Sequence, residues 1–205
     1  MDLKKIFSIL LICLVFGKMV SAQFFSIGPS AGLQHTWISD LDENAKTALH
    51  PGFNGGASMV FSTESHWGLG ADLKYSLEGS KLKSDSLNLT TKWNTSYLRL
   101  PIRGIYFFGD YGNSVRPKVF LGPTLGYLLS SKFENTDFKS TTSSFDIGVH
   151  GGVGLNFKLM EAIWLNTDVT YTKGFLDVTQ DTELSNANNL NGNVAINVGV
   201  LFGLR

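Results

Sequence analysis

The sequence predicts an all-β protein, an eight-stranded antiparallel up-and-down transmembrane β-barrel that is preceded by a cleaved signal peptide. Three observations support this prediction. Long segments alternate between apolar and small or polar residues, their connections are alternately long and short, and the N-terminus has the composition of a secretory leader. Successive side chains of a strand point to opposite faces, so an alternating segment becomes a ribbon with one apolar face.

The clearest alternating segment is residues 145–158. Its odd positions, from Phe145 to Phe157, are apolar apart from Gly151, whereas its even positions are small, polar or charged. The segment is longer than an average soluble strand of ~5–6 residues. A tilted strand that crosses a bilayer needs ~9–11 residues, so this segment is long enough to span a membrane.

The first half of the chain after the leader repeats this alternation four times. A polar loop follows the first strand, and the tight turn Glu64-Ser65-His66 separates the second strand from the third. The third strand alternates throughout from Trp67 to Glu78, and a second long polar segment follows it. We expect strands at 24–37, 52–63, 67–78 and 92–108, loops at 38–50 and 79–91, and a turn at 64–66.

The second half adds four more strands. A short turn rich in Gly, Asp and Asn precedes the fifth strand, and asparagines mark the last long loop. We expect strands at 115–133, 145–158, 163–172 and 191–204, loops at 134–143 and 177–190, and turns at 109–114 and 159–162. Four long loops against three short turns is the asymmetry of outer-membrane barrels, and an even strand number places both termini at the short-turn end.

The first 22 residues have the features of a secretory signal. Lys4 and Lys5 form a positive n-region, an apolar stretch follows, and a small-residue cleavage site ends the leader. We therefore expect residues 1–22 to be removed and residues 23–205 to form the barrel domain. The apolar stretch is too short for a membrane helix, which needs ~20 residues. Cys13 is the only cysteine, so the mature chain has no intrachain disulfide or thiolate metal site.

Charged residues are confined to the non-apolar face of the strands. A Lys or Arg that faced lipid at the midplane would cost ~2–4 kcal/mol, so we expect these side chains inside the barrel. Eight strands leave an interior just wide enough for side chains to fill it, which predicts a plugged lumen with paired charges. The expected interior charge network is Asp72, Lys74, Glu78, Arg99, Arg103, Arg116, Lys118, Lys132, Asp146, His150, Lys158 and Asp168.

Aromatic residues collect where the strands meet the short turns, as in the interfacial girdle of membrane barrels. The opposite orientation, with the apolar face inward, would make a soluble lipocalin-like ligand-binding barrel. Glycines on the polar face and a cysteine-free mature chain favour the membrane barrel. The expected membrane-interface aromatics are Phe25, Phe61, Trp67, Tyr106, Phe108, Phe157, Trp164 and Phe202.

Three of these strands carry short motifs, at residues 96–102, 122–127 and 145–154, and together these motifs resemble a known family, the PorT-like outer membrane β-barrel proteins. Residues 96–102 (Ser-Tyr-Leu-Arg-Leu-Pro-Ile) resemble its aromatic-Leu-x-Ile/Leu-Pro-Leu motif, although Arg99 stands where that motif has an acidic residue. Residues 122–127 (Gly-Pro-Thr-Leu-Gly-Tyr) resemble its Gly-Pro-x-x-Gly-Tyr strand, and residues 145–154 resemble its Asp-x-Gly/Gly-x-Gly strand. The resemblance covers 24–204. It implies an outer-membrane location, and the namesake's role implies an association with protein secretion.

Other functions have weaker signals. His35, Ser39, Asp40 and His50 lie near one rim, where a hydroxyl beside a base could make a lipid-modifying enzyme, but their spacing matches no established motif. Loop carboxylates could hold Ca²⁺, although a solvated role is the simpler interpretation. These acidic residues are Asp40, Asp42, Glu43, Asp177, Asp181 and Glu183.

The sequence therefore predicts a porin-like protein of the Gram-negative cell envelope, located in the outer membrane with both termini in the periplasm. We expect a structural, binding or assembly role and no enzymatic activity, cofactor or metal. The mature chain has 14 cationic and 16 anionic residues, which does not suit nucleic-acid binding. The expected partners are outer-membrane lipid, the outer-membrane assembly machinery and secretion or envelope proteins, and we expect the barrel to be a monomer.

Overall fold

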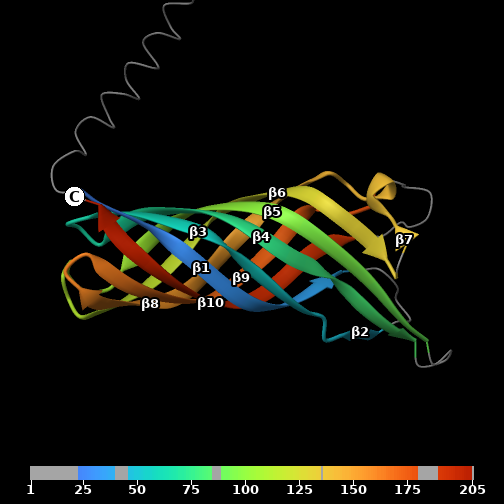
Figure 1. The fold of residues 1–205 in the computed structure, drawn as a ribbon, viewed down its shortest axis with the longest axis horizontal. Coiled ribbons are helices and arrows are strands. Elements are labelled where there is room, and N and C mark those ends of the chain that lie inside the picture. The colour runs from blue at the N-terminus through green and yellow to red at the C-terminus, as the bar shows by residue number, and fades with distance from the viewer. Residues whose placement is uncertain (1–22, 40–45, 85–88, 135, 180–188, 205) are drawn as a thin grey trace, which may run out of the picture.

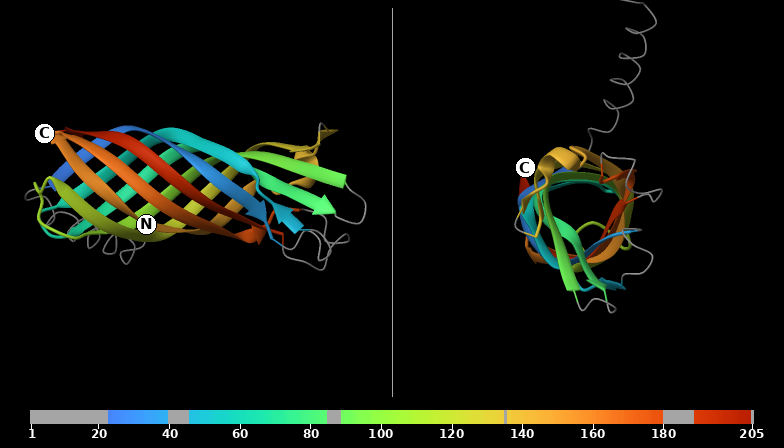
Figure 2. Two further views of the ribbon diagram at one scale, coloured as in Figure 1. Left: turned by 90° about the horizontal axis from the view of Figure 1, so that it is seen from below. Right: turned by 90° about the vertical axis from the view of Figure 1, so that its right-hand side faces the viewer.

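The computed structural model describes residues 23–39, 46–84, 89–134, 136–179 and 189–204. These residues form a closed barrel of eight long antiparallel strands, as predicted (Figures 1 and 2). The expected signal peptide, residues 1–22, lies outside the described residues. In the described part of the chain, no helix is long and apolar enough to cross a membrane.

Six of the eight barrel strands lie within about three residues of the predicted ranges, and the strands that begin at Trp67 and Ile163 continue beyond them, to Ser84 and Asp177. Two short strands, β2 (Lys46–Ala48) and β7 (Thr136–Asp137), and a 3₁₀ turn, η1 (Lys139–Thr141), lie in segments that the sequence predicts as loops. The barrel strands are β1 (Gln23–Ile38), β3 (Pro51–Thr63), β4 (Trp67–Ser84), β5 (Leu89–Phe107), β6 (Val115–Phe133), β8 (Phe145–Met160), β9 (Ile163–Asp177) and β10 (Leu190–Leu204).

Each barrel strand pairs with its neighbours in sequence, and one further pairing, between β1 and β10, completes the ring. Around the barrel the order is β4-β3-β1-β10-β9-β8-β6-β5, with β5 paired again to β4. The first strand pairs with the last, from Phe25 opposite Leu204 to Ile38 opposite Asn191. Because the barrel closes on itself, it has no free strand edge.

Strands β4 and β5 continue as a hairpin beyond the end of the barrel where the long loops lie (Figures 1 and 2). The sequence predicts a loop at 79–91 because the apolar alternation stops there. The strands nevertheless remain paired up to Ser84 opposite Leu89, and β2 pairs with residues 81–83 on the other edge of β4. Backbone pairing therefore extends the hairpin where no apolar face is needed.

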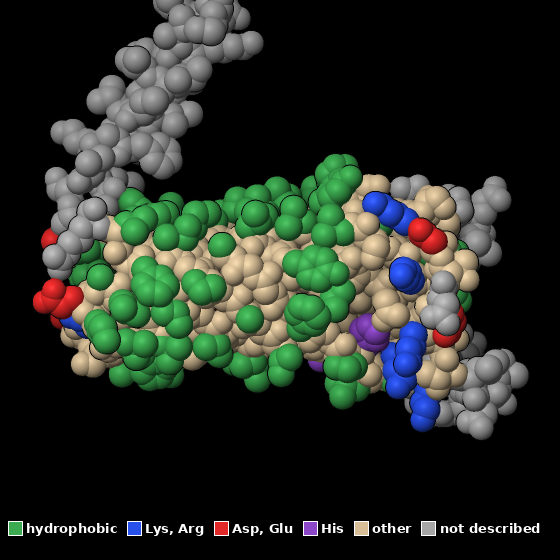
Figure 3. Space-filling view, viewed as in Figure 1, with side chains coloured by type: hydrophobic (Ala, Val, Ile, Leu, Met, Phe, Trp, Pro, Cys, Tyr) green, Lys and Arg blue, Asp and Glu red, His purple; other side chains and the backbone are tan. Residues whose placement is uncertain are grey.

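Apolar side chains face outward and polar side chains face inward. Burial alternates along β6, and outward residues such as Leu121 and Ile196 are 65% and 63% exposed. On the face drawn in Figure 3, apolar side chains cover the barrel from near its short-turn end to just short of its long-loop end, and we call this surface the apolar belt. This is the orientation predicted for a membrane barrel and the reverse of a soluble lipocalin-like barrel.

The prediction that Lys132 faces the interior is wrong, because a β-bulge changes the alternation in β6. Ser96 pairs with Ser130 whereas Tyr97 pairs with Leu128, so Leu129 is an extra residue. After an extra residue, every following side chain moves to the other face. Lys132 is accordingly exposed.

The prediction that Trp164 belongs to the outer aromatic girdle is also wrong. Trp164 lies on the inward face of β9 opposite Leu201, and it is only 5% exposed. The other seven predicted aromatics are exposed or partly exposed at the short-turn end: Phe25, Phe61, Trp67, Tyr106, Phe108, Phe157 and Phe202. Among them, Tyr106 packs edge-on against Trp67 and Phe108, with ring centroids 5.1 and 5.2 Å apart.

Leu121→Lys tests the orientation of the apolar face. Leu121 lies in the middle of the belt, so a lysine there should lower the free energy of unfolding by ~2–4 kcal/mol in a bilayer. Val115→Lys, at the end of the same strand, is the matched control and should cost at most ~1 kcal/mol. Urea titration of the barrel in lipid vesicles measures both values, and equal effects would contradict the assigned orientation.

Candidate functional site

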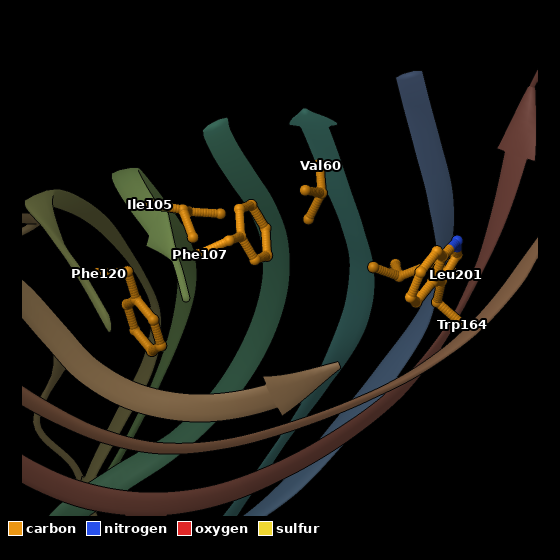
Figure 4. Packing of buried hydrophobic residues seen from close by; sticks show 6 residues of the cluster. All are labelled: Val60, Ile105, Phe107, Phe120, Trp164 and Leu201. Atoms are coloured by element: carbon orange, nitrogen blue, oxygen red, sulfur yellow. The ribbon is translucent and has the colours of Figure 1, made fainter. Parts of the chain in front are cut away.

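The short-turn end of the lumen is filled by an apolar cluster that draws residues from opposite walls of the barrel (Figure 4). Tyr111, from the turn after β5, packs against this cluster, stacks on Phe24 at a centroid distance of 3.8 Å, and lies 5.9 Å from Trp164. The turn therefore contributes an aromatic side chain to the same plug. The cluster consists of Val60, Ile105, Phe107, Phe120, Trp164 and Leu201.

Arg116 lies directly beside this apolar cluster. It is only 2% exposed, and its guanidinium carbon is 4.2 Å from the ring centroid of Phe107 and 5.4 Å from that of Tyr111. It forms no ion pair with any carboxylate that the structure describes. A cation over aromatic faces is stabilised by the ring quadrupoles, and this contact is the main one that the structure shows for Arg116.

The middle of the lumen holds a charge cluster centred on Asp72. Arg103 binds its carboxylate with both terminal nitrogens, at 2.5 Å from Nη1 to Oδ2 and 2.9 Å from Nη2 to Oδ1. Lys74 Nζ lies 3.2 Å from Oδ2 of the same carboxylate. Asp72 has no solvent exposure. One buried carboxylate thus pairs with two cations, in part through the bidentate geometry that Arg favours.

A second ion pair reaches from β6 past β8 to β9. Lys118 Nζ lies 2.9 Å from Asp168 Oδ1 and also donates a short hydrogen bond to Asn166. Asn166 in turn donates to Asp168 Oδ2 at 2.8 Å. The three side chains form a closed network, so the buried ammonium has two oxygen acceptors.

A third cluster lies toward the long-loop end and is centred on Arg99. Its Nε and Nη2 donate to the two carboxylate oxygens of Glu78 at 2.8 and 2.6 Å, and Nη1 lies 2.7 Å from Asp146 Oδ2. Asn191, on the opposite wall, donates to that same Asp146 oxygen at 3.0 Å and contacts the hydroxyl of Tyr97. These contacts connect the two sides of the lumen.

Neutral polar side chains fill the space between the charge clusters, and most of them were not predicted as site residues. Gln34 donates to Ser76 Oγ at 2.9 Å, and His150 Nδ1 lies 3.0 Å from Thr172 Oγ1. A cavity of about 40 Å³ remains among them, bordered by Lys74, Glu78, Arg99, His150 and Asn197 together with further polar residues. The sequence alternation in β1 and β10 already places neutral polar side chains on the inward face. This alternation is the signal by which the lumen residues of these strands could have been identified.

Ten of the twelve predicted interior residues are buried, which places them together in the lumen. Lys132 is exposed for the reason given above, and Lys158 is partly exposed at the short-turn mouth without an ion pair among the described residues. The buried ten are Asp72, Lys74, Glu78, Arg99, Arg103, Arg116, Lys118, Asp146, His150 and Asp168.

The predicted rim residues do not form a nucleophile and base pair in the described part of the chain. Ser39 Oγ donates to the carbonyl of Leu190 at 3.0 Å and accepts from Lys173 Nζ at 2.9 Å. His35 Nδ1 accepts the backbone N–H of His50 at 3.3 Å. The described residues contain no cluster of His, Cys, Asp or Glu that could hold a metal ion. Asp40, Asp42, Glu43, Asp181 and Glu183 lie outside the described residues.

Asp72→Ala tests how strongly the interior charges depend on one another. The substitution leaves Arg103 and Lys74 buried without a carboxylate, so the free energy of unfolding should fall by ~3–5 kcal/mol. Replacing the pair together, as Asp72→Leu with Arg103→Met, should recover much of this loss because no buried guanidinium is then left unpaired. Urea titration in vesicles compares the variants, and a double variant no more stable than Asp72→Ala would contradict the assigned pairing.

Comparison with known proteins identifies the family. The family described as the outer membrane protein beta-barrel domain matches residues 21–180. Among curated proteins, no sequence match was found.

Among solved structures, the chain is similar to the outer membrane protein OprG from Pseudomonas aeruginosa, with 14% identity, a TM-score of 0.57, and 90% of this chain and 97% of OprG covered. It is also similar to outer membrane protein W of E. coli, with 15% identity, a TM-score of 0.50, and coverage of 90% and 100%. Neisserial surface protein A has 15% identity, a TM-score of 0.50, and coverage of 89% and 99%. These similarities show a shared fold, and the family match over most of the sequence shows that the chain belongs to the outer membrane protein beta-barrel domain family.

Proposed function

We propose that the chain is an integral outer-membrane barrel of structural or binding type with a plugged lumen. In this proposal the short turns and both termini face the periplasm, and the long loops and the β4–β5 hairpin face the exterior. The distribution of connections supports this direction, because outer-membrane barrels have short periplasmic turns and longer extracellular loops. The barrel would then present its loop end to the surroundings of the cell.

The packing of the lumen is the observation that carries the proposal. The apolar cluster occupies the short-turn end, and the Asp72, Lys118 and Arg99 networks occupy the rest. The cavity of about 40 Å³ among these side chains has room for only a few water molecules, because one water needs roughly 10–15 Å³ of such space. A space of this size supports trapped water and does not support a path for hydrated solutes.

Conductance measurements test the plugged lumen. Purified, refolded barrel in planar bilayers should give no stable large-conductance steps, because the side-chain networks leave no continuous aqueous channel. A purified general porin reconstituted in the same bilayers is the positive control. Stable, reproducible steps of porin size from the barrel would contradict the proposal.

We also propose that the barrel acts beside a protein export system and is not itself an enzyme. The support for export is the resemblance of residues 96–102, 122–127 and 145–154 to PorT-like proteins. The support for a non-enzymatic role is the bonding of Ser39, whose hydroxyl is held between Leu190 and Lys173 and not beside an imidazole. A partner protein would bind the barrel at its loop end or its short-turn end, where the chain lies outside the membrane.

Deletion of the chain tests the export role. Cells without the barrel should secrete less protein across the outer membrane, because an export system would lack one component. Re-expression of the wild-type chain should restore secretion, and the total content of other outer-membrane proteins serves as the control for general envelope damage. Unchanged secretion in the deleted strain would argue against the export role without affecting the plugged barrel.

A further inference from the structure

A group of lysines lies on the outer surface where β4, β5 and β6 leave the apolar belt. Lys83, Lys92 and Lys132 are exposed and Lys81 is partly exposed. Figure 3 shows that Lys and Arg side chains gather at this end, just beyond the apolar belt. We call these four residues, Lys81, Lys83, Lys92 and Lys132, the basic collar.

The strand register brings the members of the basic collar close together. Lys81 is directly opposite Lys92 in the β4–β5 ladder, and Lys132 is opposite Asn94, two residues along β5 from Lys92. Side chains directly opposite on antiparallel strands have Cβ atoms ~4.5–5.5 Å apart, and like charges at that spacing repel each other. An anion shared between the lysines would relieve this repulsion.

Two described carboxylates border the basic collar. Asp137 is directly opposite Lys132 in the β6–β7 ladder, and Glu134 accepts the backbone N–H of Lys92 at 2.8 Å. Neither forms an ion pair with any of the four lysines, so in the described part of the chain four cations face two carboxylates. The bulge at Leu129 is what turns Lys132 outward, so a local irregularity in β6 adds a cation to the group.

The position of the basic collar indicates what kind of anion it meets. On β4 the outward series is Tyr75, Leu77, Gly79, Lys81 and Lys83, so the charges begin four residues beyond the last apolar side chain. At ~3.3 Å per residue this step is roughly 13 Å along a tilted strand, so the lysines lie beyond the acyl chains, on the headgroup side of the belt. Lysine stems can also lie along apolar surface while the ammonium reaches polar atoms.

We propose that the basic collar binds the phosphate groups of phosphorylated glycolipids in the outer leaflet of the membrane. This proposal rests on the orientation given under the proposed function, in which the long-loop end faces outward. The lysines lie on the outer surface, beyond the apolar residues that contact the acyl chains. One lipid can therefore satisfy both surfaces, with its chains on the belt and its phosphates between the lysines. At the opposite, short-turn rim, Glu64, Asp110 and Glu161 are exposed, and Lys158 is partly exposed.

Lipid binding by folded barrel in nanodiscs tests the proposal. The probe is a bisphosphorylated glucosamine lipid (lipid A) in neutral phosphatidylcholine, compared with the same lipid after removal of its phosphates. The wild-type chain should bind the phosphorylated form roughly tenfold or more tightly, and this preference should shrink in high salt because the charges are solvent-exposed. Replacing the collar by Lys81→Gln, Lys83→Gln, Lys92→Gln and Lys132→Gln should abolish the preference.

Two matched variants separate charge from position. Changing the same four lysines to arginine keeps the charge and should keep the preference, and Lys158→Gln removes a cation at the opposite rim and should leave it unchanged. Wild-type affinity in the four-glutamine variant, equal binding of both lipid forms, or displacement of the lipid by a lower concentration of a soluble sulfated polysaccharide would each overturn the proposal. The last result would mean that the collar selects a soluble polyanion.

Heat-modifiable gel mobility and membrane fractionation distinguish failure of this proposal from failure of the proposed function. A variant that folds, inserts and binds both lipids equally refutes the basic collar and leaves the outer-membrane barrel intact. If the wild-type chain does not fractionate with the outer membrane, this refutes the outer-membrane location on which the basic collar and the proposed function both depend. If the four-glutamine variant does not fold, the pair Lys81→Gln and Lys92→Gln makes the same comparison with less change to the hairpin.

Discussion

Inside hydrocarbon, every backbone N–H and C=O group has to be paired within the chain, because no water is present to satisfy it. The ladder between β1 and β10 meets this requirement, since it turns a row of eight strands into a ring without an edge. Side-chain direction follows from the same requirement. Once the strands are fixed in a ring, alternate residues must face lipid or lumen, and the sequence has to supply an apolar residue for one and a small or polar residue for the other.

The lumen shows how the inward-facing charged side chains are stabilised. Burying an ion without a partner is expensive, and a buried pair is tolerated when its geometry is good and its remaining polar atoms are bonded. Arg99, Arg103 and Lys118 each have a carboxylate within 3 Å. Arg116 differs from these residues, because its guanidinium lies over an aromatic ring instead of beside a carboxylate. The interior therefore changes from ionic to aromatic along the barrel axis, and the change occurs where the short turns close the lumen.

Much of this fold follows from alternation alone. The barrel strands, their order and the inward position of ten ionisable residues could all be predicted, because a period of two is imposed on every strand that lies between lipid and lumen. The errors have physical causes. Lys132 was placed on the wrong face because one extra residue in β6 is visible only in the strand register. Trp164 was placed outside because its residue type outweighed its position on the inward face. The ends of β4 and β5 were missed because a hairpin in water needs no apolar alternation.

The pairing of β1 with β10 has a consequence for how the protein is made. The seam joins Phe25 to Leu204 and Ile38 to Asn191, so its two halves are the first and last strands to leave the ribosome. The ring cannot close before β10 has been made, and until then β1 keeps an open edge of unpaired backbone groups. A chain shortened by its last strand would lack one side of the seam, and both β1 and β9 would be left with an open edge.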